Sequence, residues 1–91
     1  MAPPFQTIKV RRVSYLVEPV KDPHAHLIPV YFVLHNPRGR RYLLVPSKER
    51  PDRLIGLARM THFSPYRPTP FCGVFFAVQD DGKLVVAGPD A

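Results

Sequence analysis

The 91-residue chain lacks several features that mark secreted and membrane proteins. Its single cysteine, Cys72, excludes an internal disulfide. Unbroken apolar runs, such as residues 30–34, are far shorter than the roughly 20 residues that cross a membrane as a helix. The first residues have no basic segment ahead of an apolar one, so no secretion signal is expected. These absences predict a soluble cytoplasmic protein that does not insert into membranes.

Residues that could support catalysis or hold a metal are also scarce. His24 and His26 lie near Asp22, but a third ligand is not evident, so neither a metal nor another cofactor is expected. Cys72 lies in the apolar segment PFCGVFF, which predicts a buried and unreactive thiol. No carboxylate pair lies in an apolar setting, and no glycine-rich phosphate loop occurs. A protein without enzymatic activity is therefore expected.

Proline, in contrast, is abundant, with 12 residues where roughly 5% of a chain is usual. Proline breaks helices and removes a donor from β-ladders, so long regular elements are not expected. Most prolines lie between apolar runs rather than inside them, as in a folded protein. We expect one small domain over residues 1–91, with residues 1–4 flexible and residues 61–71 forming a proline-rich, extended connector.

Short runs of β-branched and aromatic residues predict about five strands. They lie at residues 7–19, 27–35 and 40–46, and in the two arms of a hairpin within residues 73–88. In the first run the apolar alternation changes phase at Arg11 and Arg12, which predicts a bulge or a strong bend. The second run is apolar on both faces, which is typical of a central strand covered on both sides.

Two tight turns are expected between these strands. Asn36, Pro37 and Gly39 occupy positions that a type I turn prefers. Asp81 and Gly82 form a strong turn signal between two apolar runs. Each turn should join adjacent antiparallel strands.

Residues 51–59 predict a short amphipathic helix. Pro51 suits a first helical turn, and the apolar residues 54, 55, 57 and 58 fall on one arc at helical spacing, although Gly56 weakens the pattern. The expected fold is therefore α+β, with strands and helix in the order β-β-β-α-β-β and the helix packed on one face of an antiparallel sheet. One core is predicted to contain Phe32, Leu34, Leu54, Ile55, Phe76 and Val86.

The charge of +6 is unevenly distributed along the chain. Residues 38–59 contain two acids and seven basic residues, namely Arg38, Arg40, Arg41, Lys48, Arg50, Arg53 and Arg59. A second basic group contains Arg11 and Arg12. The guanidinium group suits phosphate and carboxylate, and the turn at residues 36–39 does not itself require arginines.

These nine residues suggest a non-enzymatic binding module that contacts the phosphates of DNA or RNA. No helix-turn-helix, zinc knuckle or RNP-type aromatic motif is present, so this hypothesis depends on charge alone. A protein-interaction module is the alternative, in which the basic surface or an exposed sheet edge binds an acidic partner. Edge pairing could also form a homodimer, and surface arginines that only maintain solubility are a further interpretation.

Overall fold

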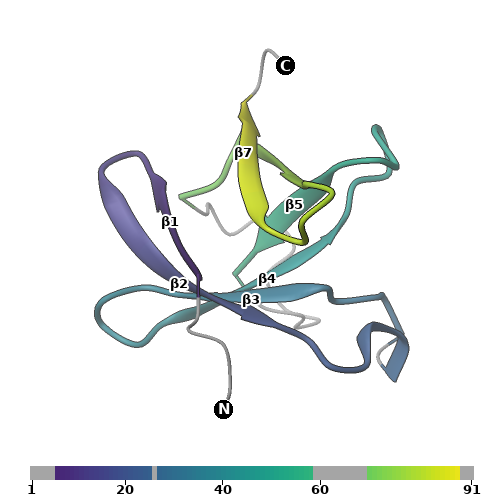
Figure 1. Cartoon of the computed structure of the whole chain (residues 1–91), viewed down its shortest axis with the longest axis horizontal. Helices are drawn as coiled ribbons and strands as arrows, with labels where there is room; N and C mark the ends of the chain where they lie inside the picture. The colour runs from purple at the N-terminus through teal and green to yellow at the C-terminus, as the bar shows by residue number, and fades with distance from the viewer. Residues whose placement is uncertain (1–5, 26, 59–69, 89–91) are drawn as a thin grey trace.

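One curled antiparallel sheet forms the whole of the described structure. The computed structural model describes residues 6–25, 27–58 and 70–88. Their seven strands follow one another in chain order and form a nearly closed barrel (Figure 1). The strands are β1 (Gln6–Val10), β2 (Val13–Pro19), β3 (Phe32–His35), β4 (Arg41–Pro46), β5 (Leu54–Leu57), β6 (Phe75–Val78) and β7 (Leu84–Gly88).

The expected α+β fold with five strands and one helix is wrong. Within the described ranges the helical structure is one 3-10 turn, η1 (Pro23–Ala25), and no described helix is long and apolar enough to cross a membrane. The predicted helix at residues 51–59 is a turn followed by β5, while Arg59 lies outside the described residues. An isolated helix of this length is marginal, whereas pairing with β4 satisfies the backbone of this segment.

The loop before β5 determines this outcome. The Arg53 amide donates to the Arg50 carbonyl at 2.8 Å, and the Ser47 amide donates to the Arg53 carbonyl at 2.9 Å. These bonds reverse the chain, so that Leu54 pairs with Pro46 in an antiparallel register. Hydrogen bonding to β4, rather than the helical spacing of the apolar residues, therefore decides the conformation of residues 54–57.

The first predicted strand, residues 7–19, is a hairpin rather than a bulged strand. Arg11 and Arg12 form a two-residue turn between β1 and β2, and Val10 pairs with Val13. Residues that pair across antiparallel strands share one face of the sheet. The turn therefore places the even-numbered Ile8 and the odd-numbered Tyr15 on the same buried face, which explains the change of phase.

Both predicted turns are confirmed. In the β3–β4 turn the Gly39 amide donates to the Asn36 carbonyl at 2.9 Å, and in the β6–β7 turn the Gly82 amide donates to the Gln79 carbonyl at 2.9 Å. Gly39 and Gly82 have φ of 83° and 86°, respectively. This is the geometry of a type I turn followed by a left-handed residue, which glycine adopts readily.

The predicted core is partly confirmed. Leu34, Phe32, Leu54 and Phe76 are buried. Ile55 is half-buried and Val86, on the edge strand β7, is 41% exposed. An edge strand such as β7 has a neighbour on one side only, so less of its surface is covered.

The second predicted strand, residues 27–35, is shorter than expected, because β3 begins at Phe32 and residues 27–28 are exposed.

Phe71 fills the interior of the barrel. Its ring centroid lies 5.0 Å from those of Tyr15 and Tyr42 and 5.6 Å from that of Phe76. Burial raises the pKa of the Tyr15 phenol, and the neighbouring Tyr42 adds to this effect. The hydroxyl of Tyr15 is therefore neutral at physiological pH.

Phe71 was expected to end the extended connector, but it belongs to a tight turn. The Val74 amide donates to the Phe71 carbonyl at 2.9 Å, within a turn at residues 70–73. Residues 61–69 of the predicted connector, and the predicted flexible residues 1–4, lie outside the described residues.

The ring of Phe71 also packs directly against Gly56 of β5. A Cβ atom added at Gly56 would lie 2.6 Å from Phe71 Cδ2, so the backbone of β5 needs glycine there.

The side chain of Gln6 joins the first and last described strands of the barrel. Gln6 Nε2 donates to the Leu84 carbonyl at 2.6 Å, and the Leu84 amide donates to Gln6 Oε1 at 2.9 Å. The side-chain amide of Gln6 thus makes the two hydrogen bonds that a backbone residue makes in a β-ladder. Within the described residues, β1 and β7 are therefore joined by this side chain and not by strand pairing.

Replacement of Gly56 by alanine should destabilise the protein. We expect Gly56→Ala to lower the free energy of unfolding by about 1–3 kcal/mol, because the added methyl group overlaps the ring of Phe71. Urea unfolding measures the change. In a Phe71→Leu background the same substitution should cost less, and an equal cost in both backgrounds would contradict the contact as the cause.

Removal of the Gln6 amide should open the barrel seam. Gln6→Ala removes two hydrogen bonds and should cost about 1–2 kcal/mol, with faster hydrogen exchange at the Leu84 amide. Gln6→Glu keeps the acceptor for that amide and should protect it better than Gln6→Ala does. The exposed neighbour Thr7 supplies the control, since Thr7→Ala should leave the exchange of Leu84 unchanged.

Candidate nucleic-acid interface

The antiparallel strand order places successive connections at alternate ends of the barrel. The β1–β2 turn (residues 11–12) and the β3–β4 turn (residues 36–40) lie at one end, which we call the hairpin end. The β2–β3, β4–β5 and β6–β7 connections lie at the opposite end. In Figure 1 the two hairpins project at the left of the view, and the β2–β3 and β4–β5 connections lie at the right.

This alternation divides the basic segment that is continuous in the sequence. Arg38, Arg40 and Arg41 lie at the hairpin end, whereas Lys48, Arg50 and Arg53 lie in the β4–β5 connection at the opposite end. Residues 42–47, most of them in β4, separate the two groups, at roughly 3.3 Å per residue. Arg59 lies outside the described residues.

Arg11 and Arg12 instead join the first group at the hairpin end. Six cations lie there, namely Lys9, Arg11, Arg12, Arg38, Arg40 and Arg41. One described acid reaches this end, because the Glu18 carboxylate lies 2.7 Å from Nε2 of His35, the residue that pairs with Arg41. The other five described carboxylates belong to the opposite end, and they are Asp22, Glu49, Asp52, Asp80 and Asp81.

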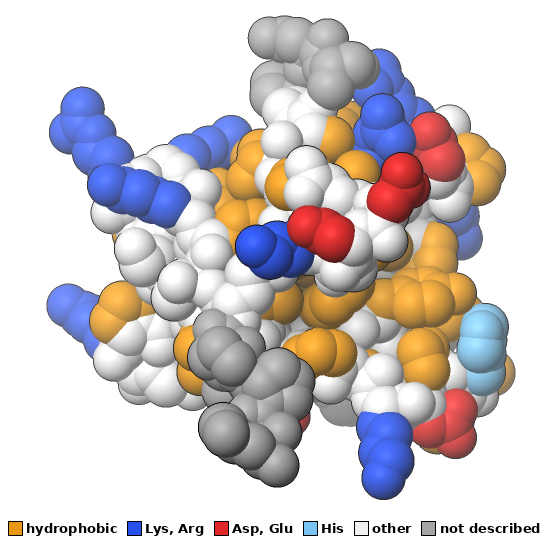
Figure 2. Space-filling model, viewed as in Figure 1, with side chains coloured by type: hydrophobic (Ala, Val, Ile, Leu, Met, Phe, Trp, Pro, Cys, Tyr) orange, Lys and Arg blue, Asp and Glu red, His pale blue; other side chains and the backbone are white. Residues whose placement is uncertain are grey.

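The surface of the molecule reflects this separation of charge. Five cations at the opposite end, Lys21, Lys48, Arg50, Arg53 and Lys83, are mixed with five of the six acids. Figure 2 shows blue side chains with no red ones beside them at the left margin, over the two hairpins, and red beside blue towards the right. An anionic partner would therefore meet an uncompensated positive potential only at the hairpin end of the described structure.

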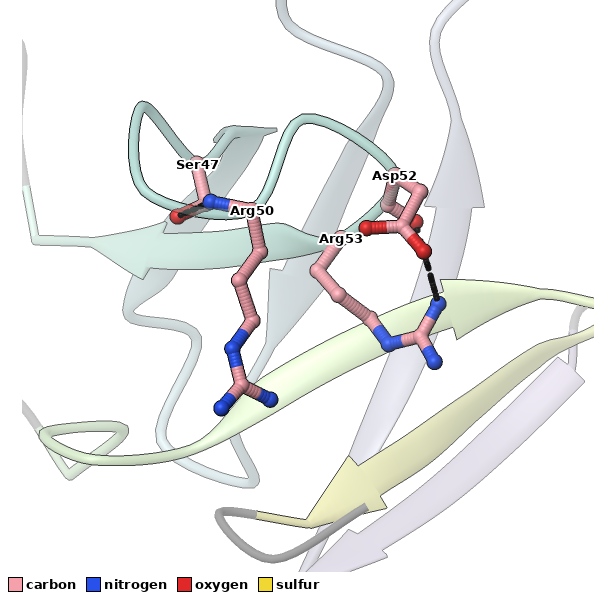
Figure 3. A network of polar contacts seen from close by, with 4 residues as sticks. All are labelled: Ser47, Arg50, Asp52 and Arg53. Atoms are coloured by element: carbon pink, nitrogen blue, oxygen red, sulfur yellow. Dashed lines mark hydrogen bonds and ion pairs between the residues drawn. The ribbon is translucent and has the colours of Figure 1, made fainter.

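Arginines at the opposite end already have interactions within the protein. Arg53 Nη1 lies 3.0 Å from Asp52 Oδ2, an ion pair visible in Figure 3. The guanidinium of Arg50 lies over the ring of Phe75, 5.0 Å from its centroid, and the Arg50 amide donates to the buried Ser47 Oγ at 3.2 Å. A partner would have to share or break these contacts, so this group suits binding less well than the hairpin end does.

The β3–β4 turn presents its arginines on a well-ordered backbone. Asn36 Oδ1 accepts hydrogen bonds from the amides of Arg38 and Arg40, at 2.9 and 2.8 Å. Arg38, Arg40 and Arg41 are all exposed. Within the described part of the chain, none of the three forms an ion pair with a carboxylate. Their guanidinium groups are therefore available for an anion.

The β1–β2 turn has an unusual backbone conformation. Arg11 and Arg12 have φ of 48° and 72°, the left-handed values that a two-residue type I′ turn requires and that Asn-Gly usually supplies. Such values cost a non-glycine residue about 1 kcal/mol or more. Arg11 Nη1 donates to the Pro70 carbonyl at 3.1 Å, and Nη2 donates to the Cys72 carbonyl at 2.8 Å. These bonds stabilise the turn against the 70–73 segment.

The structure also locates the residues that were considered for chemistry. Cys72 is exposed, so the prediction of a buried thiol is wrong; its neighbour Phe71 takes the interior position of the turn instead. His35 Nε2 lies 2.7 Å from Glu18 Oε1, and the His24 ring contacts that of Tyr31. His26 is not described, and the described residues contain no cluster of three metal-ligating side chains.

No family model, curated protein or solved structure matches this chain. The candidate interface is therefore defined by its own geometry. It comprises the exposed arginines of two neighbouring hairpins, namely Arg12, Arg38, Arg40 and Arg41, with Arg11 behind them as a contact to the 70–73 turn. Sequence reasoning identified all five residues but placed Arg11 and Arg12 within a strand. The change of apolar phase was the available signal for a hairpin.

The Asn36 side chain should be necessary for the β3–β4 turn. Asn36→Ala removes the acceptor for two amides, and we expect a loss of about 1–2 kcal/mol in the free energy of unfolding. Asn36→Asp keeps the acceptor and should retain most of the stability. Thermal and urea unfolding would show the difference, and equal losses for both variants would rule out the acceptor role.

Proposed function

We propose that this protein is a non-enzymatic binding module that contacts the phosphate backbone of DNA or RNA through the hairpin end. The observation that carries the proposal is the separation of charge: six cations lie at this end, and among the described acids only Glu18 reaches it, through His35. Phosphates carry one charge per nucleotide, and proteins bind them mainly by neutralising that charge. An end with a large excess of cations is the arrangement that this mode of binding favours.

The chemistry of the side chains supports the same partner. Five of the six cations are arginines, whose planar forks donate two parallel hydrogen bonds to a phosphate. Arg12, Arg38, Arg40 and Arg41 extend from turns, where they can reach the convex surface of a nucleic acid. Such contacts position a protein on the backbone and carry no base preference by themselves. The module should therefore bind with little dependence on sequence.

The other predicted contacts lie outside the proposed interface. Lys48, Arg50 and Arg53 lie at the opposite end beside acids, and Arg59 is a predicted contact outside the described residues. An acidic protein partner at the hairpin end is the competing proposal. Pairing through a sheet edge, including a homodimer, is a further alternative, since β1 and β7 are the edge strands of the described sheet. We also propose a cytoplasmic location, from the single cysteine.

A comparison of two triple variants tests the proposed function. Arg38→Ala, Arg40→Ala and Arg41→Ala together should weaken binding to every oligonucleotide and flatten the slope of log K on log salt by about two to three units. Lys21→Ala, Lys48→Ala and Lys83→Ala remove the same charge from exposed positions at the opposite end. This control should bind nearly as wild type at physiological salt, where screening acts over about 8 Å.

Fluorescence anisotropy with duplex and single-stranded oligonucleotides, from low to physiological salt, provides the measurement. Both variants should unfold within about 0.5 kcal/mol of wild type, since the substituted side chains are exposed. Absence of binding by wild type at low salt would reject the nucleic-acid proposal. In that case, binding to polyglutamate with the same dependence on Arg38, Arg40 and Arg41 would favour an acidic protein partner.

A further inference from the structure

The β1–β2 turn poses a problem that stability alone does not solve. A two-residue hairpin loop with two left-handed residues is the setting in which Asn-Gly is strongly preferred. Arginine occupies both positions here, with φ of 48° at residue 11 and 72° at residue 12. All other left-handed residues in the described structure are glycines. A conformation that disfavours the residue present often marks a functional position.

The two arginines of this turn have different surroundings. Arg11 uses both terminal nitrogens, at 3.1 Å from the Pro70 carbonyl and 2.8 Å from the Cys72 carbonyl. Its guanidinium is thus directed back towards the protein, and it connects the hairpin to the turn that carries the buried Phe71. Arg12 is exposed, and its side chain makes no hydrogen bond to another described residue. Only Arg12 is therefore available to a partner from this turn.

We infer that Arg12 is a phosphate-contacting residue and that Arg11 is its positioning residue. This inference rests on the proposed function and specifies how one hairpin contributes to it. The two bonds of Arg11 fix the turn against residues 70–73, so that the Arg12 guanidinium projects from a rigid backbone. A side chain held in this way loses less freedom when it binds than one on a mobile loop does.

Two substitutions at residue 12 separate charge from backbone conformation. Arg12→Gly removes the guanidinium and supplies the residue that the conformation prefers, so we expect weaker binding together with a melting temperature higher by about 2–6 °C. Arg12→Gln removes the guanidinium but keeps a side chain in the left-handed conformation, so we expect the same loss of binding without the gain in stability. For both, affinity for a duplex oligonucleotide at 0.1 M salt should fall about tenfold, with the salt slope flatter by about one.

A double-mutant cycle tests the role of Arg11. Arg11→Gln should weaken binding in the wild-type background, because the turn loses its two bonds to residues 70–73. In the Arg12→Gly background the same substitution should have little further effect on affinity, because the group that it positions is absent. Losses that add in the double variant would instead show that Arg11 contacts phosphate directly and would overturn the positioning role.

The outcomes distinguish this inference from the proposed function. Lys83→Ala is the control for the loss of one charge at the opposite end, and it should bind as wild type. If wild type binds but Arg12→Gly and Arg12→Gln bind equally well, the inference fails while the proposed function stands. If Arg12→Gly melts no higher than wild type, the strain argument fails. If wild type itself does not bind, the proposed function fails first.

Discussion

The packing of Phe71 against Gly56 supports much of the rest of the structure. The ring occupies the barrel interior, where Tyr15 and Tyr42 each lie 5.0 Å away between ring centroids. Burial of an aromatic side chain of this size contributes more to stability than most single interactions in a small domain. The ring also fixes the turn at residues 70–73, whose carbonyls bind Arg11. A hydrophobic contact in the core thereby orders a charged turn on the surface.

The charge distribution follows from the strand order rather than from any local feature. In a meander of antiparallel strands each connection lies at the end opposite to the one before it. Basic and acidic residues that are neighbours in the sequence are therefore separated by the length of a strand, and residues far apart in the sequence are brought to one end. Like charges repel, so the excess of cations at the hairpin end should reduce stability slightly.

Local chemistry was sufficient to predict some of the fold. The turns at residues 36–39 and at residues 81–82 were predicted correctly, because Asn, Pro, Asp and Gly determine backbone geometry within a few residues. The strand at residues 40–46 was predicted for a similar reason, since its β-branched and aromatic side chains suit a half-buried sheet. The helix at residues 51–59 was predicted wrongly, because the apolar spacing of a short segment fits a helix and a strand equally well.

The sequence by itself determined the antiparallel pairs β3–β4 and β6–β7, the two glycine turns, the net charge of +6 and the identity of the arginines, since each depends on residue type or on neighbours along the chain. Only the tertiary structure decided that residues 54–57 pair as a strand, that Cys72 faces solvent while Phe71 faces the core, and that Arg11 and Arg12 join Arg38 at one end. These features arise from contacts between residues distant in sequence. Their energies depend on which strands meet, and no local window of the sequence contains that information.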